Sequence, residues 1–111
     1  MQPLSPVALH VLVALAGGSR HGYAIAQEVA RVSGGAVRMG PGTLYGSLQR
    51  LQDAGLIAEA APPADADGAH AERRRYYELT SLGVRALRVD AQRLAHALTM
   101  IEQRLGPDAA G

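Results

Sequence analysis

Hydrophobic residues follow a helical period in the first half of the chain. Residues 7–16 form a nearly continuous apolar run that is too short to span a bilayer, so we expect a helix buried on most sides. Ser5 and Pro6 suit its N-cap and first turn, and a pair of glycines ends it. A second helix is expected over residues 22–32. Its inward side chains are expected to be Tyr23, Ile25, Ala26, Val29 and Ala30.

The stretch 41–57 predicts a short helix with one apolar edge, which a glycine closes before a strand begins. Leu44, Leu48 and Leu51 lie at i, i+4 and i+7, so they share one face. The opposite face carries Gly42, Tyr45, Gly46, Gln49, Arg50 and Asp53. Glycine lets another surface approach the backbone, and glutamine and arginine can contact base edges or phosphates. An ordinary surface helix fits the same pattern, and the order of the neighbouring elements decides between the two.

Beyond this helix, alternation with a period of two predicts a hairpin. Its strands are expected over residues 56–61 and 73–79, and residues 62–72 form a polar tip that we expect to be flexible. One face of the second strand holds Tyr77 and Leu79, and the other holds Arg74, Tyr76 and Glu78. Tyr76 could contact DNA or cover the sheet, and the pattern leaves both possibilities open.

A heptad pattern then predicts a long helix over residues 81–105, capped by Thr80 or Ser81. A helix of about 25 residues is a rod of roughly 38 Å, which is long for the remaining body. We expect its apolar seam to pack against a second copy of the chain, and the alternative is a helix that lies along its own domain. The seam comprises Leu87, Ala91, Leu94, Leu98, Ile101 and Leu105. The tail over residues 106–111 is expected to be disordered.

Three helices, a two-stranded wing and a long helix are the order of a winged helix-turn-helix with an appended dimerisation helix. The predicted fold class is therefore mainly α with a small β-hairpin. We expect a DNA-binding domain over residues 1–80 and a dimerisation helix over 81–105. In this arrangement the third helix enters the major groove, and Arg73, Arg74 and Arg75 lie on the wing where phosphates would pass.

Composition narrows the classes of function. The 111 residues suit one domain, and all eleven basic residues are arginines, whose planar guanidinium suits phosphate or guanine. Because the net charge is only +1, any basic surface must be local. The chain has no cysteine, and His70 and His96 have no ligand at helical spacing, so we expect no metal site. We also expect no enzyme activity, no cofactor, no membrane span and a cytoplasmic location.

Five short blocks occur in order: His21-Gly22-Tyr23-Ala24-Ile25, Gly40-Pro41-Gly42-Thr43-Leu44-Tyr45, Leu48 with Leu51, Gly55-Leu56-Ile57, and Arg75-Tyr76-Tyr77-Glu78-Leu79-Thr80 with Gly83. In combination they resemble the PadR family of bacterial transcriptional regulators, over about residues 4–105. The resemblance implies a homodimer that binds double-stranded DNA, usually a repressor, often released by a small molecule. The residues that match the family's recognition helix are Gly42, Thr43, Tyr45, Gly46, Gln49 and Arg50. Those that match its basic wing are Arg73, Arg74 and Arg75. His21 is expected to start the second helix, and Tyr23 to pack beneath the third.

Two departures from the family bear on these expectations. The wing tip carries Asp65, Asp67 and Glu72, which phosphates would repel, so the tip points away from DNA or contributes less than usual. The chain has no tryptophan, which puts aromatic drug binding between tryptophans in doubt. A small hydrophobic effector could instead enter a pocket lined by His10, Val11 and Ala14. The alternative to DNA binding is a winged-helix module that binds another protein.

Overall fold

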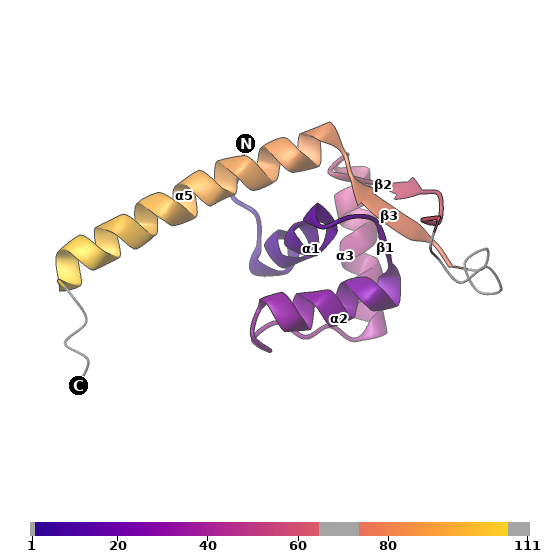
Figure 1. Cartoon of the computed structure of the whole chain (residues 1–111), viewed down its shortest axis with the longest axis horizontal. Helices are drawn as coiled ribbons and strands as arrows, with labels where there is room; N and C mark the ends of the chain where they lie inside the picture. The colour runs from indigo at the N-terminus through magenta and orange to yellow at the C-terminus, as the bar shows by residue number, and fades with distance from the viewer. Residues whose placement is uncertain (1, 65–73, 107–111) are drawn as a thin grey trace.

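A helical body carries a small sheet at one side, and a long helix runs past it (Figure 1). The computed structural model describes residues 2–64 and 74–106. Its elements, in chain order, are α1 (Pro6–Ala16), β1 (Arg20–His21), α2 (Gly22–Val32), α3 (Pro41–Asp53), β2 (Ile57–Ala60), β3 (Tyr76–Leu79) and α5 (Ser81–Leu105). The predicted order of helices and wing strands is confirmed, and so is the mainly helical fold class.

Local capping sets the ends of the helices where the sequence predicts them. The Ser5 hydroxyl accepts a hydrogen bond from the Ala8 amide at 3.1 Å, and the Thr80 hydroxyl accepts one from the Gly83 amide at 3.0 Å. Of the two candidate caps for α5, Thr80 is therefore the one used. Gly55 follows α3 with φ at 78°, a left-handed conformation that favours glycine.

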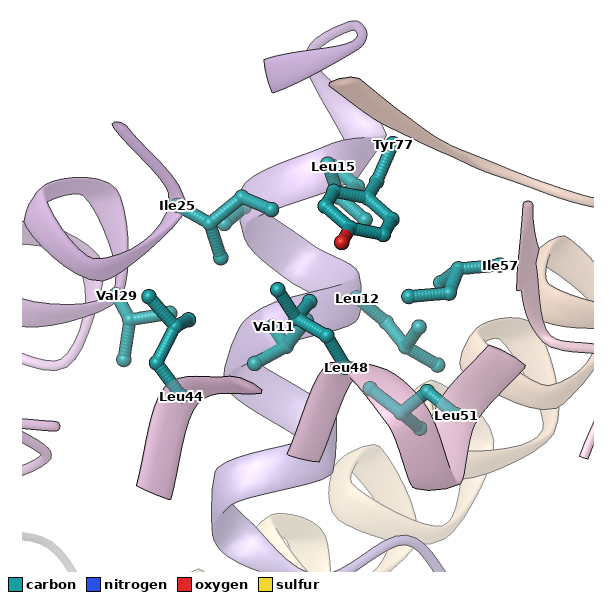
Figure 2. Close-up of a cluster of buried hydrophobic side chains, with 11 residues drawn as sticks. Val11, Leu12, Leu15, Ile25, Val29, Leu44, Leu48, Leu51, Ile57 and Tyr77 are labelled. Atoms are coloured by element: carbon teal, nitrogen blue, oxygen red, sulfur yellow. The ribbon is translucent and has the colours of Figure 1, made fainter. Parts of the chain in front are cut away.

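The core forms where α1 crosses the other elements (Figure 2). Its largest fully buried side chains are Leu12, Ile25, Leu48, Ile57, Val11 and Val29. Burial of each such side chain contributes about 1.5–3 kcal/mol. Leu44 and Leu51 join Leu48 in this core, as the helical spacing predicts. The opposite face of α3 is therefore left outside the core.

The sheet has three antiparallel strands in the order β1-β3-β2, and sequence patterns predicted only two of them. The added strand, β1, is two residues long, and it pairs Arg20 with Tyr77 and His21 with Tyr76. Both wing strands are shorter than predicted. Tyr76 covers the sheet, because its ring is buried against the ring of His21.

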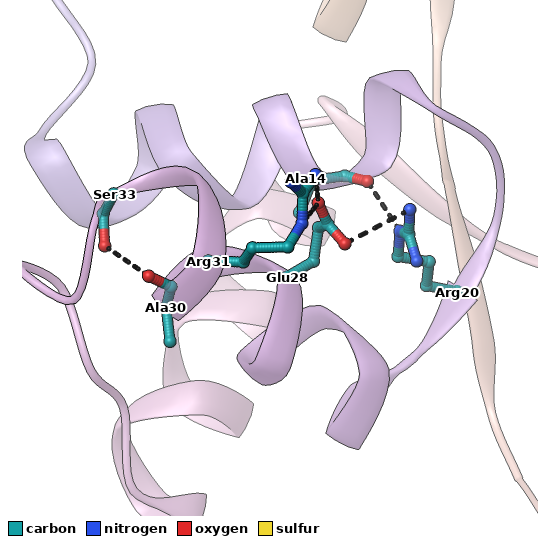
Figure 3. Close-up of polar contacts among 6 residues, drawn as sticks. All are labelled: Ala14, Arg20, Glu28, Ala30, Arg31 and Ser33. Atoms are coloured by element: carbon teal, nitrogen blue, oxygen red, sulfur yellow. Dashed lines mark hydrogen bonds and ion pairs between the residues drawn. The ribbon is translucent and has the colours of Figure 1, made fainter.

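Arg20 anchors β1 to the helical body (Figure 3). Its Nε donates a hydrogen bond to the carbonyl oxygen of Ala14 at 2.9 Å, and its Nη2 lies 3.6 Å from a carboxylate oxygen of Glu28. Glu28 also accepts hydrogen bonds from Arg31, and these bonds hold the pKa of the Glu28 carboxyl below its ordinary value. The network joins the end of α1, strand β1 and the middle of α2.

Only the first part of α5 lies against the body. Leu87 packs on the core, and the buried Asp90 accepts hydrogen bonds from the Leu4 amide at 3.0 Å and from Arg93 Nη1 at 3.1 Å. Beyond this point the helix extends away from the other elements (Figure 1). Its seam residues Leu94, Leu98, Ile101 and Leu105 are between 53% and 79% exposed. The alternative, in which the long helix lies along its own domain, therefore holds only for the first turns of α5.

Two expectations about individual side chains are corrected. Tyr23 was expected to face inward, but it is 67% exposed, because the first turn of α2 lies at the edge of the body. Val11 and Ala14 were expected to line an effector pocket, but they lie in the closed core, where α2, α3 and the sheet surround α1. Outside the described residues lie Arg73, the acidic residues of the wing tip, His70 and the tail over residues 107–111.

Candidate nucleic-acid interface

The solvent-facing side of α3 carries most of the polar residues that the sequence singled out. Exposed there are Gly42, Thr43, Tyr45, Gln49 and Arg50, and Gly46 is half-buried. Leu44, Leu48 and Leu51 hold the helix to the core from behind. Because these leucines fix the rotation of α3, the polar face presents a rigid strip to an incoming partner.

Two of the strip's side chains already make local hydrogen bonds. Gln49 Nε2 donates to Asp53 Oδ1 at 2.9 Å, and Arg50 Nη2 donates to the Ser47 hydroxyl at 3.3 Å. Arg50 lies at a hollow of about 260 Å³ between α3 and the start of α1, which Ser5 and Thr43 also line. The Gln49–Asp53 bond is exposed and exchanges with water at little cost, and the Arg50–Ser47 bond is a long, partly buried contact of an otherwise exposed side chain, so both side chains can turn to a ligand.

A cleft of about 510 Å³ opens beside this strip, at the junction of α2, α3 and the base of the wing. It is lined by His21, Gly22, Tyr23, Tyr45, Arg74, Arg75 and Tyr77. Sequence reasoning assigned these residues to separate elements and did not bring them together. The pairing of β1 with β3 does so, because it places the start of β3 next to the start of α2. The exposed position of Tyr23 follows from its place at the cleft.

The missing side chain of Gly22 makes room for Tyr45 in this cleft. A Cβ atom at Gly22 would lie 3.0 Å from the Tyr45 hydroxyl oxygen and 3.2 Å from its ring. The Tyr45 ring therefore lies directly over the start of α2. This contact connects the polar strip on α3 to the cleft.

The charge on this surface is positive near the wing. Arg74 and Arg75 are both exposed, and Arg75 has a weak ion pair with Glu59, with 3.8 Å between the charged atoms. Burial raises the pKa of the Tyr77 hydroxyl, and the nearby Arg75 opposes this shift. The Tyr77 phenol is therefore neutral at physiological pH and does not cancel the arginine charges.

The remaining candidate residues lie elsewhere. His10 Nδ1 donates a hydrogen bond to the Pro6 carbonyl oxygen at 2.6 Å, within α1. Within residues 2–64 and 74–106, no three His, Asp or Glu side chains gather where they could hold a metal ion. No helix in this part of the chain is long and apolar enough to cross a membrane.

The helix order, the three-stranded wing and the exposed strip on α3 define a winged helix-turn-helix protein. Residues 11–89 match the sequence profile described as the Transcriptional regulator PadR-like family. The chain therefore belongs to the PadR-like family of transcriptional regulators, and the predicted resemblance is confirmed.

Individual relatives support this assignment. The chain is 35% identical over 88 residues to Transcriptional regulator Rv3488 of Mycobacterium tuberculosis, covering 79% of this chain and 75% of that one. It is 38% identical over 98 residues, 88% of its length, to an uncharacterized 37.1 kDa protein in transposon TN4556 of Streptomyces fradiae. The chain spans only 26% of that protein. A PadR family transcription regulator from Clostridium difficile has the same fold, with a TM-score of 0.72 at 24% identity, covering 92% of this chain and 100% of that one.

Proposed function

We propose that this PadR-like regulator is a homodimeric repressor that binds an inverted-repeat DNA operator. Each subunit would place α3 in one major groove, with half-sites about 10 bp or a multiple apart. The observation that carries the proposal is the polar strip on α3 next to the arginine-lined cleft, since groove-entering helices combine base-contacting side chains with phosphate-binding neighbours. Gly42, Thr43, Tyr45, Gly46, Gln49 and Arg50 are the proposed strip residues.

Phosphate contacts would supply most of the affinity. Arg74 and Arg75 lie at the wing base, where they would meet the backbone beside the groove, and we propose the same role for Arg73. Each phosphate that a protein neutralises steepens the fall of log K with log salt by about 0.9. Binding should therefore weaken strongly between low and high salt.

The dimer is proposed from the exposed seam of α5. Leu94, Leu98, Ile101 and Leu105 lie on one stripe with heptad spacing, in the part of α5 that follows the buried Asp90 and is exposed. Full burial of a large apolar side chain contributes about 1.5–3 kcal/mol, and these four residues, which are 53% to 79% exposed, leave a large part of that contribution unused. A second copy of α5 would cover the stripe, and Leu87 and Ala91 would continue it toward the body.

We also propose a site for a small hydrophobic effector. An apolar cleft of about 410 Å³ between the end of α1 and α5 is lined by Ala16, Leu79, Val84, Leu87, Arg88 and Ala91. It replaces the pocket expected at Val11 and Ala14. A ligand there would change the angle of α5 and so the spacing of the two α3 helices, provided that it binds one dimer geometry better.

The proposal is tested by fluorescence anisotropy on the DNA directly upstream of the chain's own gene. Scrambled DNA is the competitor, and two salt concentrations are compared. Specific, salt-sensitive binding is expected. Arg50→Ala should weaken it by about 1–3 kcal/mol if Arg50 contacts a base. Arg104→Ala is the matched control, because it removes the same charge at the far end of α5.

Two results would contradict the proposal. Weak and equal binding to both DNAs, at both salt concentrations, would remove specific recognition and favour a protein partner. An Arg50→Ala loss no larger than that of Arg104→Ala would remove Arg50 from the interface. Light scattering on each variant shows whether the dimer is intact.

A further inference from the structure

The hydrogen bonds of His21 define which of its ring nitrogens carries a proton. His21 Nδ1 lies 3.2 Å from the amide nitrogen of Ala24 and caps the start of α2. A backbone N–H can only donate, so Nδ1 must accept with its lone pair. The neutral ring then carries its proton on Nε2, and Nε2 is a donor.

A second donor faces this nitrogen. Arg74 Nη1 lies 3.2 Å from His21 Nε2, and a guanidinium has no acceptor. The two groups cannot hydrogen-bond to each other while the cap is formed. A single third atom that accepts two hydrogen bonds would satisfy both N–H groups at once.

The surroundings hold this pair in place. Tyr76 meets the His21 ring edge-on, with ring centroids 5.6 Å apart and planes at 86°. The β1–β3 pairing sets His21 opposite Tyr76, two residues beyond Arg74. The pairing therefore fixes the two donors relative to each other, apart from the flexible arginine stem.

The cleft around them suits an anion. Tyr23 and Tyr45 line it, and their hydroxyls can donate as well. Arg75 adds a second positive charge at its rim. Burial, and then the charge of Arg74, hold the pKa of His21 below its ordinary value, so the capping, neutral tautomer predominates at neutral pH. A phosphate oxygen is the acceptor that matches two converging donors beside positive charge.

We propose that His21 and Arg74 form a two-donor clamp for one phosphate of the DNA backbone, beside the groove that α3 enters. The clamp rests on the proposed DNA-binding function and adds His21 to the interface. His21 then has two tasks, since one ring nitrogen caps α2 while the other contacts the phosphate. Free inorganic phosphate has the same chemistry, and the test separates the two sources.

The first test uses two substitutions measured by anisotropy on the operator fragment at several salt concentrations. His21→Asn keeps the cap, because asparagine is a favoured N-cap residue, but it has no nitrogen at the position of Nε2. We expect about tenfold weaker DNA binding and an unchanged salt slope. The melting temperature is measured as well, because the substitution also removes the ring contact with Tyr76. Arg74→Gln should lower the salt slope by about 1. The double variant should lose less than the product of the two single losses, because both donors share one acceptor.

The outcomes separate the clamp from the proposed function. Wild-type protein that binds DNA with a steep salt slope, while both variants bind equally well, would overturn the clamp alone. Wild-type protein without salt-dependent DNA binding would overturn the proposed function, and the DNA assignment of the clamp with it.

A phosphate titration, at constant ionic strength in chloride, follows the His21 ring nitrogens by NMR. The site would be assigned to free phosphate instead if two results occurred together. The wild-type protein would show a saturating shift at low phosphate concentration that Arg74→Gln lacks, and neither substitution would weaken DNA binding. Weak, non-saturating shifts beside the expected DNA losses support the backbone phosphate.

Discussion

Gly83 allows α5 to start directly against the wing, and we predict that Gly83→Ala destabilises the fold. A Cβ atom there would lie 2.1 Å from the carbonyl oxygen of Leu56 and 3.1 Å from its carbonyl carbon. Leu79 Cδ2 would lie 3.3 Å away. The obstacle is mainly backbone, so the first turn of α5 must move away from Leu56, the residue just before β2. The same Leu56 oxygen accepts the Thr80 amide at 3.1 Å, and this movement strains that bond.

The opposing contributions can be compared. Overpacking costs about 1–3 kcal/mol, and losing one hydrogen bond costs about 1 kcal/mol. Alanine offsets about 1 kcal/mol of this, because it favours the helix over glycine. The free energy of unfolding should therefore fall by about 1–3 kcal/mol, a large part of the stability of a small domain.

Urea denaturation followed by circular dichroism measures the effect. All variants are compared at one protein concentration, since association shifts apparent stability. Gly46→Ala is the control, because its Cβ would meet only the Arg50 guanidinium, at 3.5 Å. The control should gain about 0.5–1 kcal/mol. If Gly83→Ala unfolds at the same urea concentration as wild type or a higher one, the close approach of α5 to Leu56 is refuted.

Three further predictions follow from single contacts. Leu98→Asp places a charge in the middle of the seam, so light scattering should detect a monomer for this variant and the proposed dimer for the wild type. Asp90→Ala removes the acceptor of the Leu4 amide and should lower the free energy of unfolding in urea by about 1–3 kcal/mol, with a smaller loss in Asp90→Asn. His21 has a lowered pKa in the folded protein, so as the pH falls the unfolded chain takes up a proton on this histidine first. The stability that neutral His21 contributes is therefore fully present above the ordinary histidine pKa of about 6.5, and it is lost as the pH falls through and below that value. Urea titrations at neutral and acidic pH should detect this loss in wild type, and it should be smaller in His21→Asn.

Each of these has a clear opposite result. A Leu98→Asp dimer would mean that the seam does not form the interface. An Asp90→Ala protein as stable as wild type would remove the Leu4 contact from the energetics of the fold. Equal acid sensitivity in wild type and His21→Asn would show that His21 protonation is not coupled to folding.

The sequence alone determined the elements whose cause is local. The leucine spacing in α3 predicted both its buried face and its polar face, because a helix repeats every 3.6 residues whatever surrounds it. The caps at Ser5 and Thr80 and the glycine after α3 were equally predictable, since each acts on neighbouring residues. The family motifs led to the same fold, and the profile match confirmed it.

The tertiary structure alone decided what depends on residues far apart in the chain. Strand β1 has only two residues and therefore no period to detect, and its partner β3 comes more than fifty residues later. That pairing brings His21 to Arg74 and places Tyr76, which is buried, against the His21 ring. The full burial of Val11 likewise results from three elements closing around α1. Periodicity predicts which face of an element is apolar, but only long-range pairing decides which side chains from different elements share a site.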